Sequence, residues 1–290
     1  MSLSLTSEKT VLGLISHPIK HSYSPFIHNR AAEILGIDMV YLPFDVPFTN
    51  LKDAMRGVVA LNIKGFNVSL PHKENILTFL NEISEEASII SSVNTVVNDI
   101  GKLIGYNTDS FGVLDSLQDY KDLIKGNEVA IVGSGGSARA VIYTLIRHFK
   151  PEGIHIINRT EQFAETLKKY FKTSMNFEKI RAYELFPPDL VPVLTNCSVI
   201  INTTPLGMFP DTDDCFTDIA ESFVPGQLYF DLVYNPLETK QMIIAKERGA
   251  ITLGGLKMLV AQAAKSFELF TGKEMPSEQI FRELTESLKK

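Results

Sequence analysis

The stretch from Glu128 to Ala140, EVAIVGSGGSARA, constrains the fold of this chain more than any other part of its sequence. The apolar run Val129–Val132 stops abruptly at Gly133, which indicates a buried strand that enters a tight turn. Gly133, Gly135 and Ala138 then fit the pattern Gly-x-Gly-x-x-Ala. A strand, a glycine-rich turn and a helix in this order predict a doubly wound α/β fold that binds a dinucleotide at the turn.

Each small residue of this pattern has a physical role at such a site. Gly133 permits the turn, Gly135 lets the backbone approach a pyrophosphate, and Ala138 lets helix and strand pack closely. The helix predicted at residues 140–148 offers free N–H groups and a partial positive charge to phosphates. A turn that only joins a strand to a helix is the alternative reading. The cofactor-binding turn is expected to comprise Gly133, Ser134, Gly135, Gly136, Ser137 and Ala138.

Strands and helices alternate in two separate runs, which predicts two α/β domains. The first run predicts a largely parallel sheet, with strands at residues 10–15, 39–44, 65–70 and 93–97 and helices at 26–35, 50–60 and 82–90. The second run has the doubly wound pattern, with strands at residues 129–133, 154–158, about 179–183, 198–202 and 228–232. In that pattern a ligand lies at the carboxyl ends of the strands.

Two segments of the second run are therefore expected to face one crevice. The first strand ends at Gly133, and the fourth ends in NTTPLGM, residues 202–208. The fifth strand ends near Asp231 and Tyr234. After it, apolar residues recur at helical spacing from Leu256 onward, and Gly272 is a predicted helix stop.

Composition limits the classes of function. The chain has a formal net charge of -6 and no basic run, which argues against a nucleic-acid partner. No apolar run reaches membrane-spanning length, and the first residues lack the pattern of a leader peptide. Cys197 and Cys215 lack metal-type spacing and are interpreted as reduced thiols. We expect a soluble cytoplasmic protein with no metal site.

A lysine outside the glycine motif also indicates chemistry. In GFNVSLPHK, residues 65–73, Pro71 stops a short strand and puts Lys73 at the predicted start of the next helix. A lysine there opposes the helix dipole, which favours a role other than helix capping. Asn67 and Ser69 add hydrogen-bonding groups at the same strand end. A solvated lysine is the alternative interpretation.

Together these motifs resemble a known family. Nine of them follow the order found in shikimate dehydrogenases, from about Val11 to about Gly272: HSYSP, NVSLPHK, VNT, GYNTD, GSGGSARA, NRT, NTTPLGM, DLVYNP and GGLKMLVAQ. The resemblance implies an α/β substrate domain at residues 1–109 and 255–290, completed by C-terminal helices, and a Rossmann-like NAD(P) domain at residues 110–254. It implies reversible oxidation of shikimate to the 3-keto compound, with hydride passing to a nicotinamide.

The resemblance also assigns residues. Ser22 and Ser24 match the serines that bind the substrate carboxylate, and Lys73 and Asp109 match the catalytic pair. Further matches to substrate-binding positions are Asn67, Ser69, Asn94, Asp109, Tyr234 and Gln262. Beyond the glycine turn, the expected cofactor-binding residues are Asn158, Arg159, Thr160, Glu161, Thr203, Thr204, Leu206, Met208, Leu232 and Gly255.

The chemistry of alcohol oxidation leaves two roles open for Lys73. Hydride loss from a secondary alcohol requires proton removal from its oxygen, and a nearby cation stabilises alkoxide character. Partial burial would lower the lysine pKa from about 10.4 and suit a base, whereas a neighbouring Asp109 carboxylate favours the ammonium form. Lys73 therefore either transfers the proton or stabilises the alkoxide, and Asp109 orients it and binds substrate.

Two residues that bear on specificity, Ser69 and Phe163, differ from the common family pattern. Ser69 stands where many biosynthetic members have threonine, and the smaller side chain leaves space that admits quinate as a second substrate. Arg159 suits the 2′-phosphate of NADP, but Phe163 replaces a frequent second arginine and Glu161 suits a ribose diol. These features favour NAD narrowly, with NADP as the alternative or second cofactor.

Two other functions are compatible with the cofactor motif alone. One is a different two-domain oxidoreductase, such as a methylenetetrahydrofolate dehydrogenase, and the other is a nucleotide-sensing protein without catalysis. Ser22 and Ser24 together with Lys73 and Asp109 argue against both. The sequence identifies no surface for self-association, so no oligomeric state is predicted.

Overall fold

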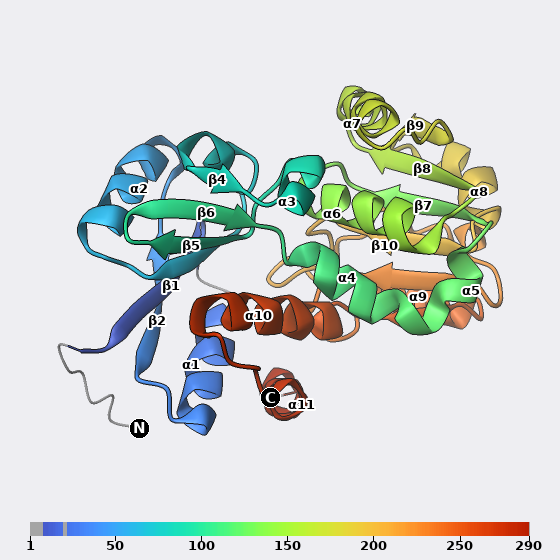
Figure 1. Ribbon diagram of the computed structural model, residues 1–290. Helices are drawn as coiled ribbons and strands as arrows, with labels where there is room; N and C mark the ends of the chain where they lie inside the picture. Colours follow the sequence, from blue (N-terminus) through green and yellow to red (C-terminus); the bar gives the residue numbers. More distant parts are fainter. Residues whose placement is uncertain (1–7, 20–21, 290) are drawn as a thin grey trace. The chain divides into compact units, whose positions relative to one another are not determined.

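The computed structural model describes residues 8–19 and 22–289 (Figure 1). The chain divides into two compact units. The first unit comprises Met1–Thr108 and Val260–Leu284, and the second comprises Asp109–Leu259 and Thr285–Lys290. Each unit contains a six-stranded sheet. His21, the first residue of the motif HSYSP, lies outside the described residues.

The sheet of the first unit has the strand order β2-β1-β3-β5-β6-β4. Its strands are β1 (Thr10–Ser16), β2 (Met39–Asp45), β3 (Gly65–Val68), β4 (Glu82–Ile83), β5 (Thr95–Asp99) and β6 (Lys102–Tyr106). β1 runs parallel to β2 and β3, whereas β5 runs antiparallel to both β3 and β6. β6 and β4 run in the same direction as β1–β3, so this sheet is largely parallel, as expected, and β5 is the antiparallel strand of the six described. The two-residue turn at Ile100 and Gly101 explains β5, because so short a connection can join only antiparallel strands.

Helices of the first unit cover its sheet. They are α1 (Ser24–Leu35), α2 (Leu51–Ala60), α3 (Glu85–Ile90), the short helices η1 (Phe48–Asn50) and η2 (Asn75–Phe79), and most of α10 (Leu256–Thr271) and α11 (Ser277–Leu288). Leu51, Met55 and Val58 form the apolar face of α2 and pack with Phe66 and Val96 of the sheet. Burying each such side chain stabilises the fold by about 1.5–3 kcal/mol.

The helix predicted at residues 82–90 is shorter than expected. Glu82–Ile83 pairs with β6 as β4, and α3 begins only at Glu85. Ser84 explains the boundary, because its hydroxyl accepts a hydrogen bond from the Ala87 N–H at 3.2 Å and so caps the helix. The Lys102–Glu82 ion pair, 2.6 Å between Nζ and Oε1, adds to the pairing of β4 with β6.

Aromatic side chains connect α1 to α10. Between them His28 is 1 % exposed, stacked on Tyr41 with ring centroids 4.3 Å apart and planes 4° apart. The ring of Phe267, on α10, lies 6.0 Å from His28. Because this site is apolar, burial lowers the pKa of His28 to about 3.

This burial predicts an acid-dependent loss of stability. The unfolded chain binds a proton at His28 below a pKa of about 6.5, while the folded chain stays neutral there until about pH 3. The unfolded state then holds more protons, so stability falls as the pH falls through 6.5. We expect the free energy of unfolding to fall by about 2 kcal/mol from this group between pH 7 and pH 5.

Urea unfolding at the two pH values measures this effect, with His28→Gln as the comparison. In His28→Gln the free energy of unfolding should change by about 2 kcal/mol less between pH 7 and pH 5, whatever the absolute stability of the variant. An equal slope in both proteins, or an imidazole that titrates near pH 6.5 by NMR in the folded protein, contradicts the assignment.

The second unit contains a parallel sheet in the order β12-β11-β10-β7-β8-β9. Its strands are β7 (Glu128–Val132), β8 (Gly153–Asn158), β9 (Ile180–Glu184), β10 (Val199–Asn202), β11 (Leu228–Asp231) and β12 (Ile251–Leu253). The first five match the predicted strands, and β12 was not foreseen. The order reverses between β7 and β10, so the doubly wound switch point lies at their carboxyl ends.

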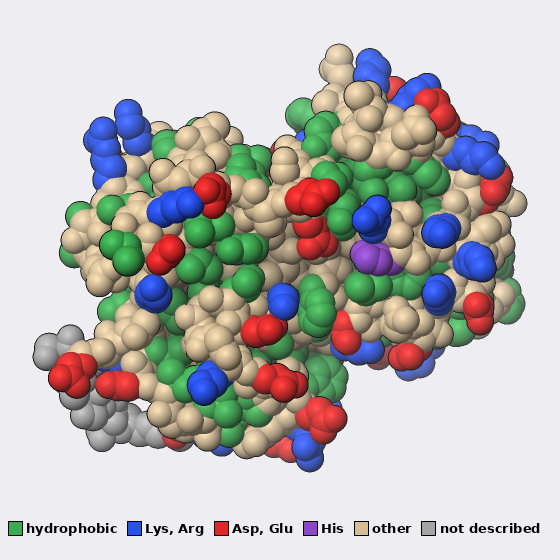
Figure 2. All heavy atoms as spheres, in the orientation of Figure 1, with side chains coloured by type: hydrophobic (Ala, Val, Ile, Leu, Met, Phe, Trp, Pro, Cys, Tyr) green, Lys and Arg blue, Asp and Glu red, His purple; other side chains and the backbone are tan. Residues whose placement is uncertain are grey.

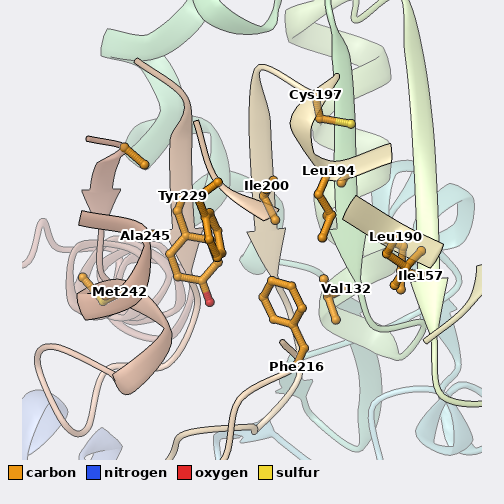
Figure 3. Packing of buried hydrophobic residues seen from close by; sticks show 13 residues of the cluster. Val132, Ile157, Leu190, Leu194, Cys197, Ile200, Phe216, Tyr229, Met242 and Ala245 are labelled. Atoms are coloured by element: carbon orange, nitrogen blue, oxygen red, sulfur yellow. The ribbon is translucent and has the colours of Figure 1, made fainter. Parts of the chain in front are cut away.

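Helices cover both faces of this second sheet. They are α4 (Asp109–Leu117), α5 (Lys121–Ile124), α6 (Gly136–Thr144), α7 (Glu161–Ser174), α8 (Pro187–Thr195) and α9 (Lys240–Glu247), with the short helices η3 (Gln118–Tyr120), η4 (Leu145–Phe149) and η5 (Ala220–Ser222). α4 and α6 lie side by side over one face (Figure 1). Over the opposite face Leu190 and Leu194 of α8 and Met242 of α9 belong to one buried cluster with Val132 and Ile200 of the sheet (Figure 3).

Two properties of the surface bear on the expected partners. No helix in residues 8–19 or 22–289 is long and apolar enough to cross a membrane. Acidic and basic side chains both occur on the face displayed in Figure 2, rather than a single sign of charge.

Candidate active site

Ser22 and Ser24 lie together at the beginning of α1. The Ser22 hydroxyl donates to the Ser24 hydroxyl at 3.3 Å and accepts from the Ser24 N–H at 3.2 Å. Pro25 occupies the first turn of α1, where a missing N–H costs nothing. Both serines are half-buried. The paired hydroxyls at the positive end of a helix suit a carboxylate.

Asn67 of β3 is the centre of a buried network in the first unit. Its Oδ1 accepts a hydrogen bond from the Tyr41 hydroxyl at 2.8 Å. Its Nδ2 faces three acceptors: the Ser266 hydroxyl at 2.9 Å, the Thr95 hydroxyl at 3.0 Å and the Asn94 carbonyl at 3.1 Å. Because an amide nitrogen has only two hydrogens, Asn67 retains free capacity only as an acceptor.

The same network reaches Asn94 and Gln262. The Asn94 Oδ1 accepts from the Thr108 N–H at 2.7 Å, and its Nδ2 donates to Gln262 Oε1 at 3.4 Å. Thr95 and Thr108 lie 2.8 Å and 3.0 Å from the Ser266 hydroxyl, measured between hydroxyl oxygens. The structure thus places Asn67, Asn94 and Gln262, which the sequence predicted, in one hydrogen-bonded network.

Several members of this network were missed from the sequence. Tyr41 lies in the largely apolar strand β2, and Ser266 is a small residue on the buried face of α10. Their polarity on otherwise buried faces is the only signal that could have identified them. Thr95 and Thr108 lie within the motifs VNT and GYNTD, so their places beside Asn94 and Asp109 could have been noted.

Lys73 lies in a turn rather than at a helix start, since η2 begins only at Asn75. Its carbonyl accepts from the Val93 N–H at 2.8 Å, just before β5. The neighbouring His72 is fully buried, and its Nε2 lies 2.7 Å from the Val46 carbonyl. Lys73 is half-buried, as is Ser69, whose N–H donates to the Ile15 carbonyl at 3.0 Å. The backbone at Lys73 is therefore held on both sides.

Asp109 is the first residue of α4 and belongs to the second unit. Only 4 % of its surface is exposed. A carboxylate in the first turn of a helix is favoured by the helix dipole. Tyr234, another predicted substrate residue, follows β11 and is half-buried in the same unit.

The glycine turn forms a cradle at the switch point of the second sheet. Gly133 has φ +114°, and a Cβ there would lie 2.3 Å from the Thr203 hydroxyl oxygen. A Cβ at Gly135 would meet nothing within 4 Å, so space lies open above it. α6 begins at Gly136, four residues earlier than predicted, with no side-chain cap and no acidic residue in its first turn. This geometry fits the pyrophosphate of a dinucleotide.

The loop after β10 lies beside this turn, as the sequence predicted. The Thr203 hydroxyl donates to the Val132 carbonyl at 2.7 Å. Asn202 Oδ1 accepts from the Thr204 N–H at 3.0 Å and from its hydroxyl at 2.6 Å. The Leu206 N–H donates to the Thr204 hydroxyl at 3.3 Å, and the Met208 N–H to the Pro205 carbonyl at 3.0 Å.

Leu232 and Gly255 are fixed against each other. The Leu232 N–H donates to the Asn202 carbonyl at 3.0 Å. A Cβ at Gly255 would lie only 2.1 Å from the Leu232 carbonyl oxygen, so this approach requires glycine.

The residues after β8 line an open depression. It contains both cations and carboxylates: Arg159, Thr160, Glu161, Gln162, Glu165, Lys169 and Glu184. Asn158 Nδ2 donates to the Thr160 carbonyl at 2.9 Å and shapes the turn. Phe163 is 62 % exposed. Lys169 and Glu184 were missed, although Lys169 follows Glu161 and Glu165 at helical spacing and Glu184 pairs with Asn158 between strands.

A doubly wound sheet with a phosphate cradle, accompanied by a second α/β unit with a polar network, defines an NAD(P)-type α/β oxidoreductase. Two family models match: the shikimate dehydrogenase substrate binding domain at residues 14–96 and the shikimate 5′-dehydrogenase C-terminal domain at residues 255–284. A shikimate dehydrogenase (NADP(+)) of Methanococcus maripaludis is 42% identical over 270 residues, 93% of this chain and 94% of that protein.

Solved structures agree. A shikimate dehydrogenase in complex with NADP+ has a TM-score of 0.91 at 38% identity, covering 99% of this chain and 98% of that one. The enzyme from Listeria monocytogenes, in complex with shikimate and NAD, has a TM-score of 0.85 at 35% identity, covering 98% and 99%. The chain belongs to the shikimate dehydrogenase family.

Proposed function

We propose that this protein oxidises shikimate reversibly to 3-dehydroshikimate, with hydride transfer to NAD(P). The observation that carries the proposal is the hydrogen-bonded network of the first unit. It contains Ser22 and Ser24 for a carboxylate, and Asn67, Asn94 and Gln262 for ring hydroxyls. A small polyhydroxy acid has both kinds of group.

The acceptor capacity left on Asn67 and the charges of Lys73 and Asp109 indicate a role for each side chain. Asn67 has both amide hydrogens occupied, so a ring hydroxyl donates to its Oδ1. Lys73 takes the proton of the reacting hydroxyl or stabilises its alkoxide, and Asp109 orients substrate and lysine. A bound nicotinamide would supply the hydride acceptor. The glycine cradle at Gly133–Ala138 and the loop at Thr203–Met208 hold the cofactor.

We further propose that NAD is used well, with NADP as the second cofactor. The depression after β8 holds two cations, Arg159 and Lys169, against Glu161, Glu165 and Glu184. Glu165 also pairs with Lys168, 2.9 Å between Oε1 and Nζ. Carboxylates repel a 2′-phosphate and suit a ribose diol. The exposed Phe163 supplies no cation.

Absorbance of the reduced nicotinamide, after protein is mixed with shikimate and either cofactor, tests both proposals. No reduction with either cofactor refutes the activity. The ratio of kcat/KM for NAD to that for NADP, at saturating shikimate, tests the cofactor. A preference for NADP of about a hundredfold, 2.7 kcal/mol, refutes the lean to NAD. Glu161→Gln is expected to move the ratio towards NADP, with Glu178→Gln, an exposed carboxylate after α7, as the control.

Quinate is proposed as a second substrate because of Ser69. The hydroxymethyl side chain lacks the methyl of threonine and leaves space for an additional hydroxyl, which shifts specificity by about 1–3 kcal/mol. We expect Ser69→Thr to lower kcat/KM for quinate by about tenfold and to change that for shikimate less. No quinate oxidation at saturating cofactor, or an unchanged quinate-to-shikimate ratio in the variant, contradicts the proposal.

The cytoplasm is the proposed location. Both cysteines are free, and Cys197 is buried, which raises its pKa to about 12. A thiol held in this form is inert and suits a reducing compartment.

A further inference from the structure

One residue, Tyr41, connects α1 to the polar network of the first unit. The Tyr41 hydroxyl donates to Asn67 Oδ1 at 2.8 Å, and the Tyr41 backbone is hydrogen-bonded to Asn29 of α1, the helix that begins at Ser24. Ser24 contacts Ser22 in turn. The helix that carries the serine pair and the asparagine of β3 are therefore connected through one buried residue, which no sequence motif indicated.

Tyr41 is fixed in place by α1. Its ring stacks on His28 with planes 4° apart. Its N–H donates to Asn29 Oδ1 at 2.8 Å, and its carbonyl accepts from Asn29 Nδ2 at 2.9 Å. Consecutive residues of one helix thus hold both the ring and the backbone. A hydroxyl held this firmly has a fixed position relative to Ser24 and Asn67.

The bond to Asn67 also selects the orientation of that amide. With the phenol donating to Oδ1, the Nδ2 points to the Ser266 hydroxyl, the Thr95 hydroxyl and the Asn94 carbonyl. Removing the phenolic oxygen leaves Oδ1 without its donor and permits the amide to turn over. The remaining acceptor capacity of Asn67 would then no longer be fixed.

We propose that Tyr41 is a positioning residue that sets the distance between the serines that bind the substrate carboxylate and the asparagine that binds a ring hydroxyl. This inference rests on the proposed oxidation of shikimate. Tyr41 does not touch substrate, since it is 1 % exposed. Burial raises the pKa of its hydroxyl well above the usual value, so it stays neutral and acts only through its hydrogen bonds.

Tyr41→Phe removes this one oxygen and is the test. We expect KM and the calorimetric Kd for shikimate to rise about tenfold, which corresponds to about 1.4 kcal/mol. We expect kcat to change less than about twofold, because neither reacting atom is contacted. With the methyl ester of shikimate, which lacks the carboxylate, the penalty is expected to shrink, because only one end then needs placing.

Tyr183→Phe is the matched control. It also loses a tyrosine hydroxyl, 3.0 Å from His155 Nδ1 in the second unit, and should leave the KM for shikimate unchanged. Ser24→Ala combined with Tyr41→Phe completes a double-mutant cycle. The free-energy penalty on shikimate binding in the double variant should be smaller than the sum of the two single-variant penalties, because the residues act as one unit.

Three results overturn the inference: an unchanged KM in Tyr41→Phe, an equal penalty with the ester, or full additivity with Ser24→Ala. If Tyr41→Phe does not fold, Asn29→Ala replaces it. That variant releases the Tyr41 backbone and should raise the KM for shikimate about threefold. An unchanged KM also contradicts the inference. Failure of the proposed function is separate, because the unaltered protein would then neither bind nor oxidise shikimate.

Discussion

Lys73→Ala is expected to lower kcat by about a thousandfold, while shikimate still binds with a Kd within a few-fold of the original. The reason is that the ammonium or amine acts on charge that appears only as the hydroxyl loses its proton. The backbone of Lys73 is held by the Val93 N–H and by the buried His72. The substitution should therefore leave the turn in place. Single-turnover kinetics and calorimetry separate the two effects.

Lys73→Arg distinguishes the two roles that remain open. Arginine keeps its charge and does not deprotonate in proteins, so it can stabilise an alkoxide but cannot act as a base. Recovery of part of the rate supports the stabilising role, and a rate as low as that of Lys73→Ala supports the base. Lys52→Ala, an exposed lysine of α2, is the control. A rise in KM with an unchanged kcat in Lys73→Ala contradicts the catalytic assignment.

Much of the fold could be predicted because the signals were local. β7 is a short apolar run that stops at a glycine, and Gly133 with φ +114° has the conformation its role requires. The switch point followed from chain order, since β7 and β10 are neighbours as expected. Gly272, with φ +67°, ends α10 where predicted.

The failures concern interactions that periodicity does not report. Residues 82–90 have helical composition throughout, but Ser84 caps α3 and leaves Glu82 to pair in a strand. The antiparallel direction of β5 follows from the short turn at Ile100 and Gly101, and the length of a connection is not part of the periodicity of the strands that it joins.

The candidate site divides in the same way. Recognisable motifs pointed to Asn67 and Asn94, and the structure places both in one hydrogen-bonded network. No motif pointed to Tyr41 or Ser266, because a tyrosine in a strand and a serine on a helix read as ordinary packing until their partners are known. Hydrogen bonds between residues far apart in the sequence have no period.

The second large effect is expected at Asp231, the last residue of β11. It is fully buried and accepts four hydrogen bonds. The Tyr229 and Thr239 hydroxyls donate to Oδ2 at 2.8 Å each, and Asn202 Nδ2 and the Val233 N–H donate to Oδ1 at 3.0 Å each. Burial raises the pKa of Asp231, while these four donors offset part of that increase.

Asp231→Ala leaves four donors without an acceptor and opens a cavity. Because unpaired buried polar groups are costly, we expect the free energy of unfolding to fall by about 3–5 kcal/mol. Urea unfolding followed by circular dichroism and tyrosine fluorescence measures it, as the chain has no tryptophan. Asp122→Ala, an exposed aspartate of α5, is the control and should change stability little.

Asp231→Asn is a sharper comparison, because the donors differ in kind. Asn202 Nδ2 and the Val233 N–H can only donate, whereas the Tyr229 and Thr239 hydroxyls can rotate and accept. An asparagine with its oxygen towards the first pair and its nitrogen towards the hydroxyls satisfies all four. We therefore expect a loss of only about 1–2 kcal/mol. Equal losses in the alanine and asparagine variants contradict this account.

The hydrogen bonds of Asp231 also connect the stability of the protein to the loop after β10 that is proposed to hold the cofactor. Asn202 binds Asp231 through Nδ2 and holds Thr204 through Oδ1, so releasing Asp231 frees the loop that begins at Thr203. In Asp231→Ala, at a temperature where the protein remains folded, we expect weaker cofactor binding by calorimetry and little change in shikimate binding, since most of the predicted substrate residues lie in the first unit. Weakened binding of both ligands would indicate general unfolding rather than a loosened loop.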